Sequence, residues 1–403
     1  MLFNQFVNET GIKENTIKGY KSSLKCYCKL NNKSFDELIK EAEEEEEQGV
    51  RWKNRKIRKR LIDYRKWLYY NKSEGTARTY FIKIKSLYRH FEIEIHKLPN
   101  FSIRGINPTY EKTEKDILTK TNIKEGYLQA NNTMKNFILL EMTTGISKTD
   151  ILNLTIQDLL NSCSEYLTDK SNFNLMDQVK ELKKLDQVVP TFEGIRQKTG
   201  TKFITFSTPE FIEHICEYLI YRDGKIKEKY NNASNEEKQK LPKELTVKDK
   251  LIDLSDEQIM ASFREINNNL NFGTVGHYVK FRSHQLRAYH ATTLLNLNNP
   301  FTINEIDVLQ GRKKDKTHRA YLIESTKKLK DKYIEGMESL YLFKTPSENN
   351  QQVNNKLYKE NKALNNEIKT LKKEIEIQKA IIEKQENKID ELKTMQEKLL
   401  NLV

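Results

Sequence analysis

Hydrophobic residues near the start of the chain recur at helical spacing. Four of them follow one another at three- and four-residue steps: Ile17, Tyr20, Leu24 and Tyr27. Such steps place side chains on one face of an α-helix, where they can pack against a core. The polar pair Asn31 and Asn32 ends the pattern. Similar patterns through the first hundred residues predict a small helical domain.

A different pattern, typical of strands, occurs in the middle of the chain. The stretch VVPTFEGIRQKTGTKFITFSTPE, residues 188–210, alternates well enough to predict two antiparallel strands that turn at residues 198–200. We expect Ser207 or Thr208 to cap the helix that follows, with Pro209 in its first turn. The fold class predicted is therefore mainly α with a small antiparallel β-sheet.

The last fifty residues carry a heptad repeat. One heptad position is occupied by leucines, and another by β-branched residues: Leu357, Leu364, Leu371, Leu392 and Leu399, and Ile368, Ile375, Ile382, Ile389 and Val403. This pattern predicts a coiled coil over residues 352–403, and β-branched residues paired with leucines favour a parallel dimer. Asn361 would fix its register, while Gln378 and Gln385 interrupt the leucine series and weaken the middle.

Changes in composition divide the chain into segments. At 403 residues, the chain is long enough for two or three domains. Pro99 and Pro108 bracket a stretch with glycine and asparagine that is typical of a linker. The predicted order is a helical domain, a linker, a mixed α+β domain and the coiled coil: residues 1–100, 101–116, 117–345 and 352–403.

The charge of the chain favours a polyanionic partner such as nucleic acid. The formal net charge is +13 and the sequence pI is near 9.2, although a basic balance alone is weak evidence. An acidic run at residues 43–47 is followed by a strongly basic segment, RWKNRKIRKRLIDYRKWLYYNK, at residues 51–72. This helix could lie against phosphates, or its charge could simply be balanced by its acidic neighbour. The sequence leaves both alternatives open.

Several other classes of protein are disfavoured. No run approaches the about 18 apolar residues that a membrane span needs, and the N-terminus lacks the apolar stretch of a secretory signal. We therefore expect the protein to act inside the cell, with no membrane partner. Four cysteines without a CxxC pair and seven histidines indicate neither a disulfide framework nor a zinc site. No cofactor or metal is expected.

Candidate chemistry lies in two motifs toward the end of the mixed domain. In SHQLRAYHATTLLN, His284 and Arg287 are three residues apart, so they share one helix face and both could reach a single phosphate. Downstream, IDVLQGRKKDKTHRAYL places Gly311 and Arg312 at a turn and Tyr321 nine residues after that arginine. Cleaving a phosphodiester without a metal needs a nucleophile, cations around the phosphate and a proton donor.

In these ordered motifs the chain resembles the tyrosine recombinase (phage-type integrase) superfamily, over residues 117–343. Members of that family carry HxLR, then leucine-glycine-His/Trp, then a tyrosine nine residues later. The resemblance implies that Tyr321 is the nucleophile and that His284 and Arg287 bind the phosphate. It makes Lys198, in the KTG turn of the hairpin, the donor to the leaving oxygen, with Lys202 as its rival. The first hundred residues would be the family's core-binding domain, which clamps the duplex.

Two positions depart from the family's pattern. Arg312 stands where most members have His or Trp, as in the LQGR sequences of archaeal virus and plasmid integrases. In TTGISKTDILNL, Ser147 stands where the family has its first arginine, with Lys148 next. Lysine cannot make the two-pronged contact of a guanidinium. Either Lys148 substitutes, an arginine such as Arg196 reaches in, or the enzyme is slow or silent.

The resemblance implies a site-specific recombinase that cleaves and rejoins duplex DNA through a 3′-phosphotyrosyl intermediate. Dimers or tetramers would assemble on paired DNA sites of a mobile element, with no metal or ATP. Two alternatives remain open. A type IB topoisomerase-like enzyme would share the residue set but relax DNA as a monomer. A catalytically lapsed DNA-binding dimer is the other, and Ser147 is the best reason to consider it.

Overall fold

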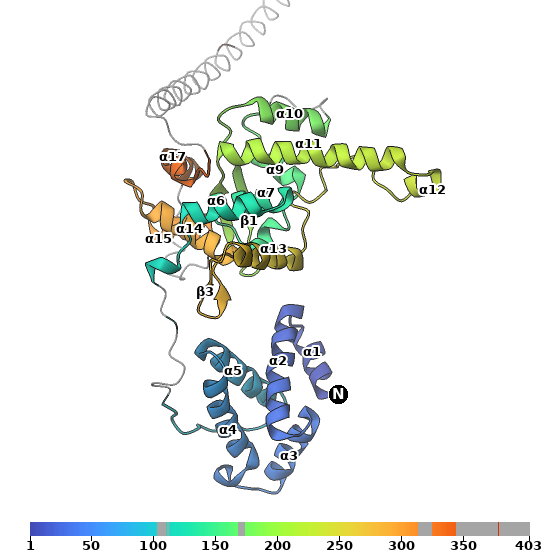
Figure 1. The fold of residues 1–403 in the computed structure, drawn as a ribbon. Helices are drawn as coiled ribbons and strands as arrows, with labels where there is room; N and C mark the ends of the chain where they lie inside the picture. The colour runs from blue at the N-terminus through green and yellow to red at the C-terminus, as the bar shows by residue number, and fades with distance from the viewer. Residues whose placement is uncertain (103–109, 111–112, 168–173, 313–324, 344–377, 379–403) are drawn as a thin grey trace, which may run out of the picture. The chain divides into compact units, whose positions relative to one another are not determined.

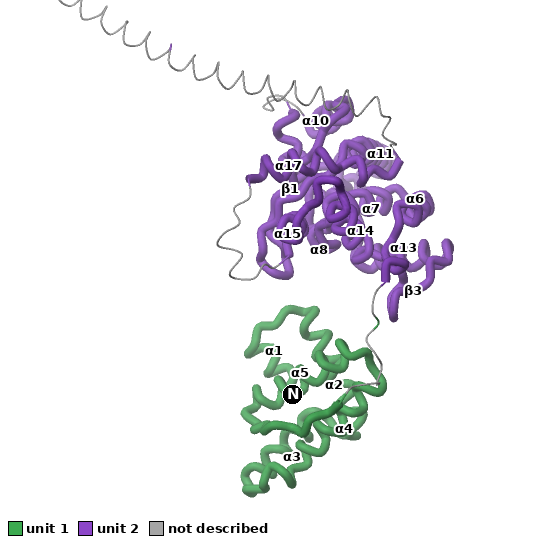
Figure 2. Tube along the Cα trace, turned by 90° about the vertical axis from the view of Figure 1, so that its left-hand side faces the viewer, with its two compact units in different colours: residues 1–112 green, residues 113–403 purple. Residues whose placement is uncertain are grey.

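The computed structural model describes residues 1–102, 110, 113–167, 174–312, 325–343 and 378. The chain divides into two units, residues 1–112 and 113–403 (Figure 2). Each unit has a hydrophobic core of its own. The coiled coil predicted over residues 352–403 lies outside the described residues, apart from Gln378.

Unit 1 is built from helices packed around one core (Figure 1). Its elements, in chain order, are α1 (Leu2–Thr10), α2 (Glu14–Asn31), α3 (Phe35–Glu47), the 3-10 helix η1 (Trp52–Asn54), α4 (Lys56–Asn71) and α5 (Glu74–His90). Leu24 and Tyr27, from the helical pattern that opens the chain, are buried on α2. The basic helix α4 buries one apolar face, formed by Ile57, Leu61, Tyr64 and Leu68.

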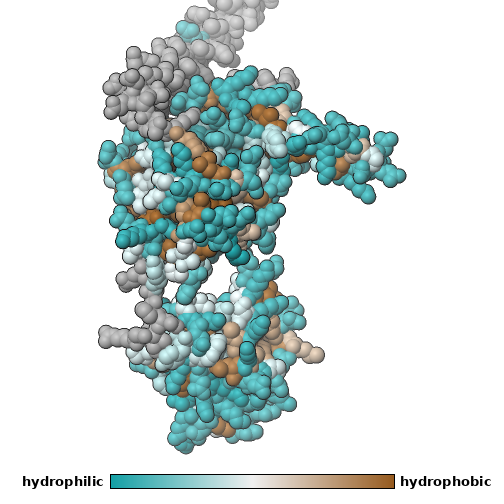
Figure 3. All heavy atoms as spheres, viewed as in Figure 1, coloured by the Kyte–Doolittle hydropathy of each residue, from teal (hydrophilic) through white to brown (hydrophobic). Residues whose placement is uncertain are grey.

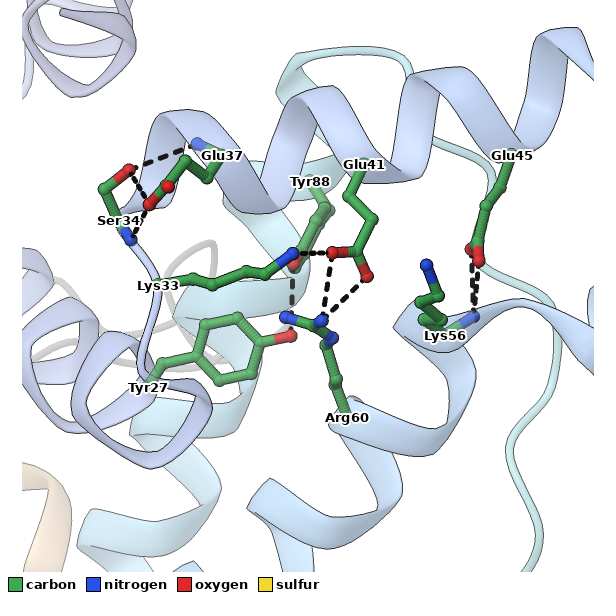
Figure 4. A network of polar contacts seen from close by, with 9 residues as sticks. All are labelled: Tyr27, Lys33, Ser34, Glu37, Glu41, Glu45, Lys56, Arg60 and Tyr88. Atoms are coloured by element: carbon green, nitrogen blue, oxygen red, sulfur yellow. Dashed lines mark hydrogen bonds and ion pairs between the residues drawn. The ribbon is translucent and has the colours of Figure 1, made fainter.

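Acidic side chains of α3 meet the start of α4 (Figure 4). Arg60 of α4 donates from Nη2 to the carboxylate of Glu41, with the closer oxygen at 2.7 Å, and Lys33 pairs with the same carboxylate. The Glu45 carboxylate accepts the backbone N–H of Lys56, at 2.9 Å, where α4 begins. A carboxylate there satisfies a helix N–H that has no partner within the helix and favourably meets the helix dipole.

Charge balance therefore explains part of the basic helix. Arg55 pairs with Glu46, as Arg60 pairs with Glu41. Arg58, Lys59 and Lys66 make no ion pair within the described part of the chain. Arg55 and Arg60 are thus balanced by α3, while the contact of the remaining cations with phosphates stays a prediction.

Unit 2 is also mainly helical. Its elements before the hairpin are η2 (Glu114–Asp116), α6 (Lys120–Gln129), α7 (Asn132–Thr144), α8 (Lys148–Ile151), α9 (Ile156–Ser162) and α10 (Leu175–Lys184). Its later elements are β1 (Thr191–Ile195), β2 (Lys202–Phe206), α11 (Pro209–Asn232), α12 (Asn235–Lys238), α13 (Asp256–Asn269), β3 (Thr274–Val275), β4 (Tyr278–Val279), α14 (Ser283–Leu295), α15 (Ile303–Leu309), α17 (Thr326–Gly336) and η3 (Met337–Leu340). The prediction of a mainly α fold with a small antiparallel sheet is confirmed.

Helix α7 lies at the centre of unit 2. Every residue from 137 to 144 is buried, and α7 packs against α6, α8, α11, α14 and β2. The strands β1 and β2 pair antiparallel, with Thr191 opposite Phe206 and Ile195 opposite Lys202, so the predicted hairpin and its turn are confirmed. The contacts of β2 with α7 and α15 fix the hairpin relative to the ends of neighbouring helices.

Two sets of contacts fix the start of α11. Thr208 caps the helix by accepting the N–H of Phe211, and Pro209 is its first residue, as the sequence predicts. The buried carboxylate of Glu210 accepts the backbone N–H groups of Leu342, at 2.7 Å, and Phe343, at 2.8 Å. The last residues of the 325–343 segment are thus fastened to the helix that follows the hairpin.

Hydrophilic side chains cover most of the visible face of each unit, and hydrophobic ones lie scattered between them (Figure 3). The far end of α11 projects from the rest of unit 2, with α12 at its tip (Figure 1). No helix in the described ranges combines the length and the hydrophobicity that a membrane-spanning segment requires.

Removing the Glu41 carboxylate should destabilise unit 1. In Glu41→Ala, the side chains of Arg60 and Lys33 lose a partner whose own side chain is only 12% exposed. We expect a loss of about 2–4 kcal/mol, since breaking a largely buried pair leaves a desolvated charge. The only two tryptophans of the chain, Trp52 and Trp67, both lie in unit 1, so their fluorescence in urea follows this unit alone.

Glu44→Ala is the matched control. The Glu44 carboxylate lies 3.9 Å from the Lys40 ammonium, and both side chains are mostly exposed, so its loss should leave the urea midpoint almost unchanged. Equal midpoints for the Glu41 and Glu44 variants would show that the Glu41 network is not a stabilising one.

Candidate active site

One buried arginine joins three parts of unit 2. Arg287, on α14, is 5% exposed. Its Nη1 donates to the carbonyl oxygen of Gly145 and its Nη2 to that of Gln310, both at 2.6 Å. These carbonyls end α7 and α15 respectively. Hydrogen bonds from a charged donor are short and strong, so the guanidinium holds the ends of two helices against α14.

Two further arginines surround Arg287. Burial first, and then the nearby charges of Arg196 and Arg312, lower the pKa of Arg287 to about 10. A group with that pKa is still protonated at neutral pH. Arg287 donates to the carbonyl of Gln310, and Arg196 Nη1 lies 3.3 Å from the carbonyl oxygen of the next residue, Gly311. Guanidinium groups from α14 and from the hairpin therefore lie at the same turn, which Arg312 follows in the chain.

The two outer arginines are positioned by the turns that carry them. Arg196 follows β1, its N–H bonds the carbonyl of Thr201 across the hairpin, and its Nη1 lies 3.3 Å from the Gly311 oxygen. Gly311 has a φ of 59°, a left-handed conformation that favours glycine. The N–H of Arg312 then bonds the carbonyl of Asp307 at 2.9 Å, and the Arg312 side chain is 42% exposed. The turn predicted there is confirmed.

The structure places the other predicted site residues at different depths. His284 is exposed in the first turn of α14, three residues before the buried Arg287. Lys198 is exposed in the turn of the hairpin, and Lys202 is exposed at the start of β2. Tyr321 lies outside the described residues. Its role as the nucleophile stays a prediction from the sequence.

The segment that departs from the family pattern has other partners. The Ser147 hydroxyl donates to Asp150 Oδ2 at 2.5 Å, and Asp150 Oδ1 accepts the N–H of Gln197 at 3.0 Å. Lys148 begins α8, and its Nζ lies 2.5 Å from Asp256 Oδ1 at the start of α13. Ser147 and Asp150 thus hold the hairpin, while the ammonium of Lys148 is bound to a carboxylate.

Sequence reasoning missed two polar residues in the core beneath Arg287. Gln310 donates from Nε2 to the Arg287 carbonyl at 2.9 Å and lies 3.1 Å from His290 Nδ1. Burial, followed by the charges of Arg287 and Arg312, lowers the pKa of His290 to about 3, so its ring is neutral. A Cβ on Gly145, whose φ is +64°, would lie 2.4 Å from His290 Nδ1. The spacing of His290, three residues after Arg287, was the available signal.

A third missed residue, Glu141, lies on α7. Its carboxyl is fully buried and accepts a hydrogen bond from Ser283 Oγ at 2.5 Å. Burial outweighs the nearby charges of Arg287 and Lys148 and raises the pKa of Glu141 to about 8. The carboxyl is therefore mostly protonated at neutral pH, and in that form it does not neutralise the positive charge of the arginines.

Comparisons with known proteins find likeness only at the level of solved structures. No family model and no curated protein match the sequence. A XerA recombinase superposes with 16% identity over 83% of this chain and 96% of its own, with a TM-score of 0.31. A XerH recombinase bound to palindromic difH has 15% identity, 78% coverage of both chains and a TM-score of 0.43. A lambda integrase tetramer bound to a Holliday junction has 13% identity over 78% of this chain and 76% of its own, with a TM-score of 0.38. With TM-scores this low, the case for a function rests on the residues described above.

The buried Glu141 should make the stability of unit 2 depend on pH. Its folded pKa, about 8, lies above the unfolded value of 4.5, so the folded state keeps a proton that the unfolded state loses. Stability then falls by about 1.4 kcal/mol per pH unit between those values. His290 has the opposite effect, but only between about 3 and 6.5. Between pH 6.5 and 8 the Glu141 effect should dominate.

Glu141→Gln should therefore remove the loss of stability between pH 6.5 and 8. Calorimetry of the full chain measures it, and tryptophan fluorescence identifies the unit 1 transition so that it can be set aside. Glu193→Gln, which changes an exposed carboxylate on β1, should keep the wild-type slope. An unchanged slope in Glu141→Gln would contradict a raised pKa for that carboxyl.

Proposed function

We propose that this chain is a site-specific DNA recombinase that cleaves and rejoins duplex DNA through a covalent 3′-phosphotyrosyl link. The observation that supports it most is the meeting of Arg287, Arg196 and Arg312, which come from three separate segments. Three guanidinium groups gathered in one place suit a phosphate whose negative charge grows during displacement. The sequence adds Tyr321, nine residues beyond Arg312.

The proposed chemistry is a pair of transesterifications. The phenolic oxygen of Tyr321 attacks the phosphorus and releases its proton to solvent water. The bond to the 5′ oxygen breaks, and Lys198 donates a proton to that oxygen. The arginines and His284 stabilise the negative charge of the pentacovalent state. The 5′-hydroxyl of the partner strand then reverses the step. Each bond broken is replaced by an equivalent one, so no ATP is needed.

Residues 1–100 would form a core-binding domain that clamps the DNA duplex. The protein would act inside the cell. The clamping role is supported by a pocket formed by α4, α5 and the segment after α5, lined by Arg65, Phe81, Lys85, Arg89, Ile95, His96, Lys97 and Leu98. Half of these residues are Lys or Arg, and no carboxylate is among them. Cations of this kind can bind the DNA backbone without reading its sequence.

A catalytically lapsed DNA-binding protein is the second candidate, because Ser147 bonds Asp150 where a phosphate-binding arginine is expected. Assays with a nicked duplex and with supercoiled DNA separate the possibilities. Covalent trapping and strand joining indicate a recombinase. Relaxation of supercoiled DNA without specific sites indicates a type IB topoisomerase, and binding without trapping indicates lapse.

Tyr321→Phe should abolish covalent attachment to DNA while leaving binding nearly intact, because the change removes only the attacking oxygen. SDS-resistant adducts with nicked duplexes are the measurement. Tyr278→Phe, which removes the hydroxyl of a tyrosine that is 66% exposed in the same unit, should form adducts at the wild-type rate. An adduct formed by the Tyr321 variant would overturn the assignment of the nucleophile.

The heptad segment at residues 352–403 is proposed to form a parallel homodimer that either tethers two catalytic units or restrains their cleavage. A tether raises the effective concentration of the second protomer. Truncation after Asn350 should change the mass in sedimentation, and it should lower recombination for a tether or raise cleavage for a restraint. Equal monomeric masses with and without the segment would contradict self-association.

A further inference from the structure

A phosphate-cleaving site of the proposed kind lacks one guanidinium in this chain, because Ser147 occupies the place of an arginine. We propose that Arg196, from the hairpin, supplies that missing guanidinium and binds a non-bridging oxygen of the scissile phosphate. This inference rests on the proposed function and chooses Arg196 among the alternatives that the sequence leaves open.

Both residues at the departure are engaged elsewhere. The short Ser147 side chain donates to Asp150, so it has no cation to offer. The Lys148 ammonium lies 2.5 Å from the Asp256 carboxylate, and the Lys148 side chain is only 22% exposed. Lys148 would have to leave this ion pair to reach a phosphate, and it would still lack the planar fork of an arginine.

Arg196 lies where a second guanidinium is needed. Its side chain lies along Gly311, where a Cβ added to the glycine would be 3.5 Å from both Cβ and Cδ of Arg196. Its Nη1 makes one long hydrogen bond, of 3.3 Å, to the Gly311 oxygen, and its Nε is buried without a partner among the described residues. A buried donor without a partner is uncommon in folded proteins and costs free energy unless a ligand satisfies it.

Like charges repel, yet backbone contacts hold these guanidinium groups together. Arg287 is fixed by two carbonyls, and Arg196 is close enough to lower its pKa. Mutual repulsion of this kind is relieved when an anion binds between the cations. A phosphate oxygen fits that need, and it would also give the Arg196 guanidinium the acceptors it lacks.

Ser147 also contributes to the position of Arg196, because both are connected to Asp150. Asp150 accepts the Ser147 hydroxyl with Oδ2 and the backbone N–H of Gln197 with Oδ1, at 3.0 Å. Gln197 directly follows Arg196, so the carboxylate holds the root of the Arg196 side chain against the loop between α7 and α8. Asp150 thus connects Ser147 to the segment that carries Arg196.

The test uses nicked duplexes selected from a random-sequence pool by SDS-resistant attachment to the wild-type chain. Arg196→Ala should slow adduct formation by about 10²–10³-fold, the usual cost of losing one donor to a developing anion. Arg196→Lys should fall between, because it keeps the charge without the fork. Arg264→Ala, which changes an exposed arginine of α13, is the control and should react at the wild-type rate. Adduct formation by Arg196→Ala at that rate would overturn the inference.

A methylphosphonate at the cleaved position separates a phosphate contact from a structural role. Methyl replaces one charged oxygen there, so a residue that neutralises that charge becomes less important. The ratio of wild-type to Arg196→Ala rates should fall by about tenfold or more on this substrate, as the loss of one charged contact implies. An unchanged ratio would mean that Arg196 only supports the hairpin. Ser147→Arg combined with Arg196→Ala should recover part of the lost rate.

A readout without activity distinguishes this inference from the proposed function. Sulfate should raise the melting temperature of unit 2 in the wild-type chain more than in Arg196→Ala, with Arg264→Ala again matching the wild type. If the wild-type chain forms no adduct but the sulfate shift depends on Arg196, the proposed chemistry fails and the anion site stands. Equal shifts in all three proteins would overturn the role of Arg196 itself.

Discussion

The described part of unit 2 depends on one guanidinium, that of Arg287, held by two backbone carbonyls. Its hydrogen bonds to Gly145 and Gln310 bring the ends of α7 and α15 to α14. The proposed site depends on this junction. Arg312 follows the end of α15, and the Arg196 side chain contacts Gly311, the residue just before Arg312. The Arg287 guanidinium therefore connects these helices and also adds positive charge to the proposed site.

The neutral polar core beneath the junction preserves that charge. A deprotonated Glu141 would cancel much of the positive potential, but burial keeps its carboxyl protonated at neutral pH. His290 is likewise held neutral, so it adds no further repulsion. Glu141 and His290 thus leave the positive charge of Arg287 uncancelled at neutral pH, and the carboxylates that act on the arginines are those of Asp150 and Asp307.

Local sequence patterns predicted the helices, strands and turns, whereas the positions of the site side chains depend on contacts between residues far apart in the chain. The hairpin, the Thr208 cap and the turn at Gly311 follow from short-range spacing and turn chemistry, and all three are confirmed. The ion pair of Lys148 with Asp256 and the contact of Arg196 with Gly311 join segments far apart in the chain. No periodicity records such contacts, so the sequence alone left Lys148 and Arg196 as open alternatives.

The Glu210 carboxylate gives unit 2 a mechanical connection. It clasps the backbone at Leu342 and Phe343 only four residues after β2 ends at Phe206. The last described residues of the unit and the segment that follows β2 are therefore held at one carboxylate. A displacement of Leu342 or Phe343 would act on that segment through Glu210, and on the core through the ring contact of Phe343 with Tyr127.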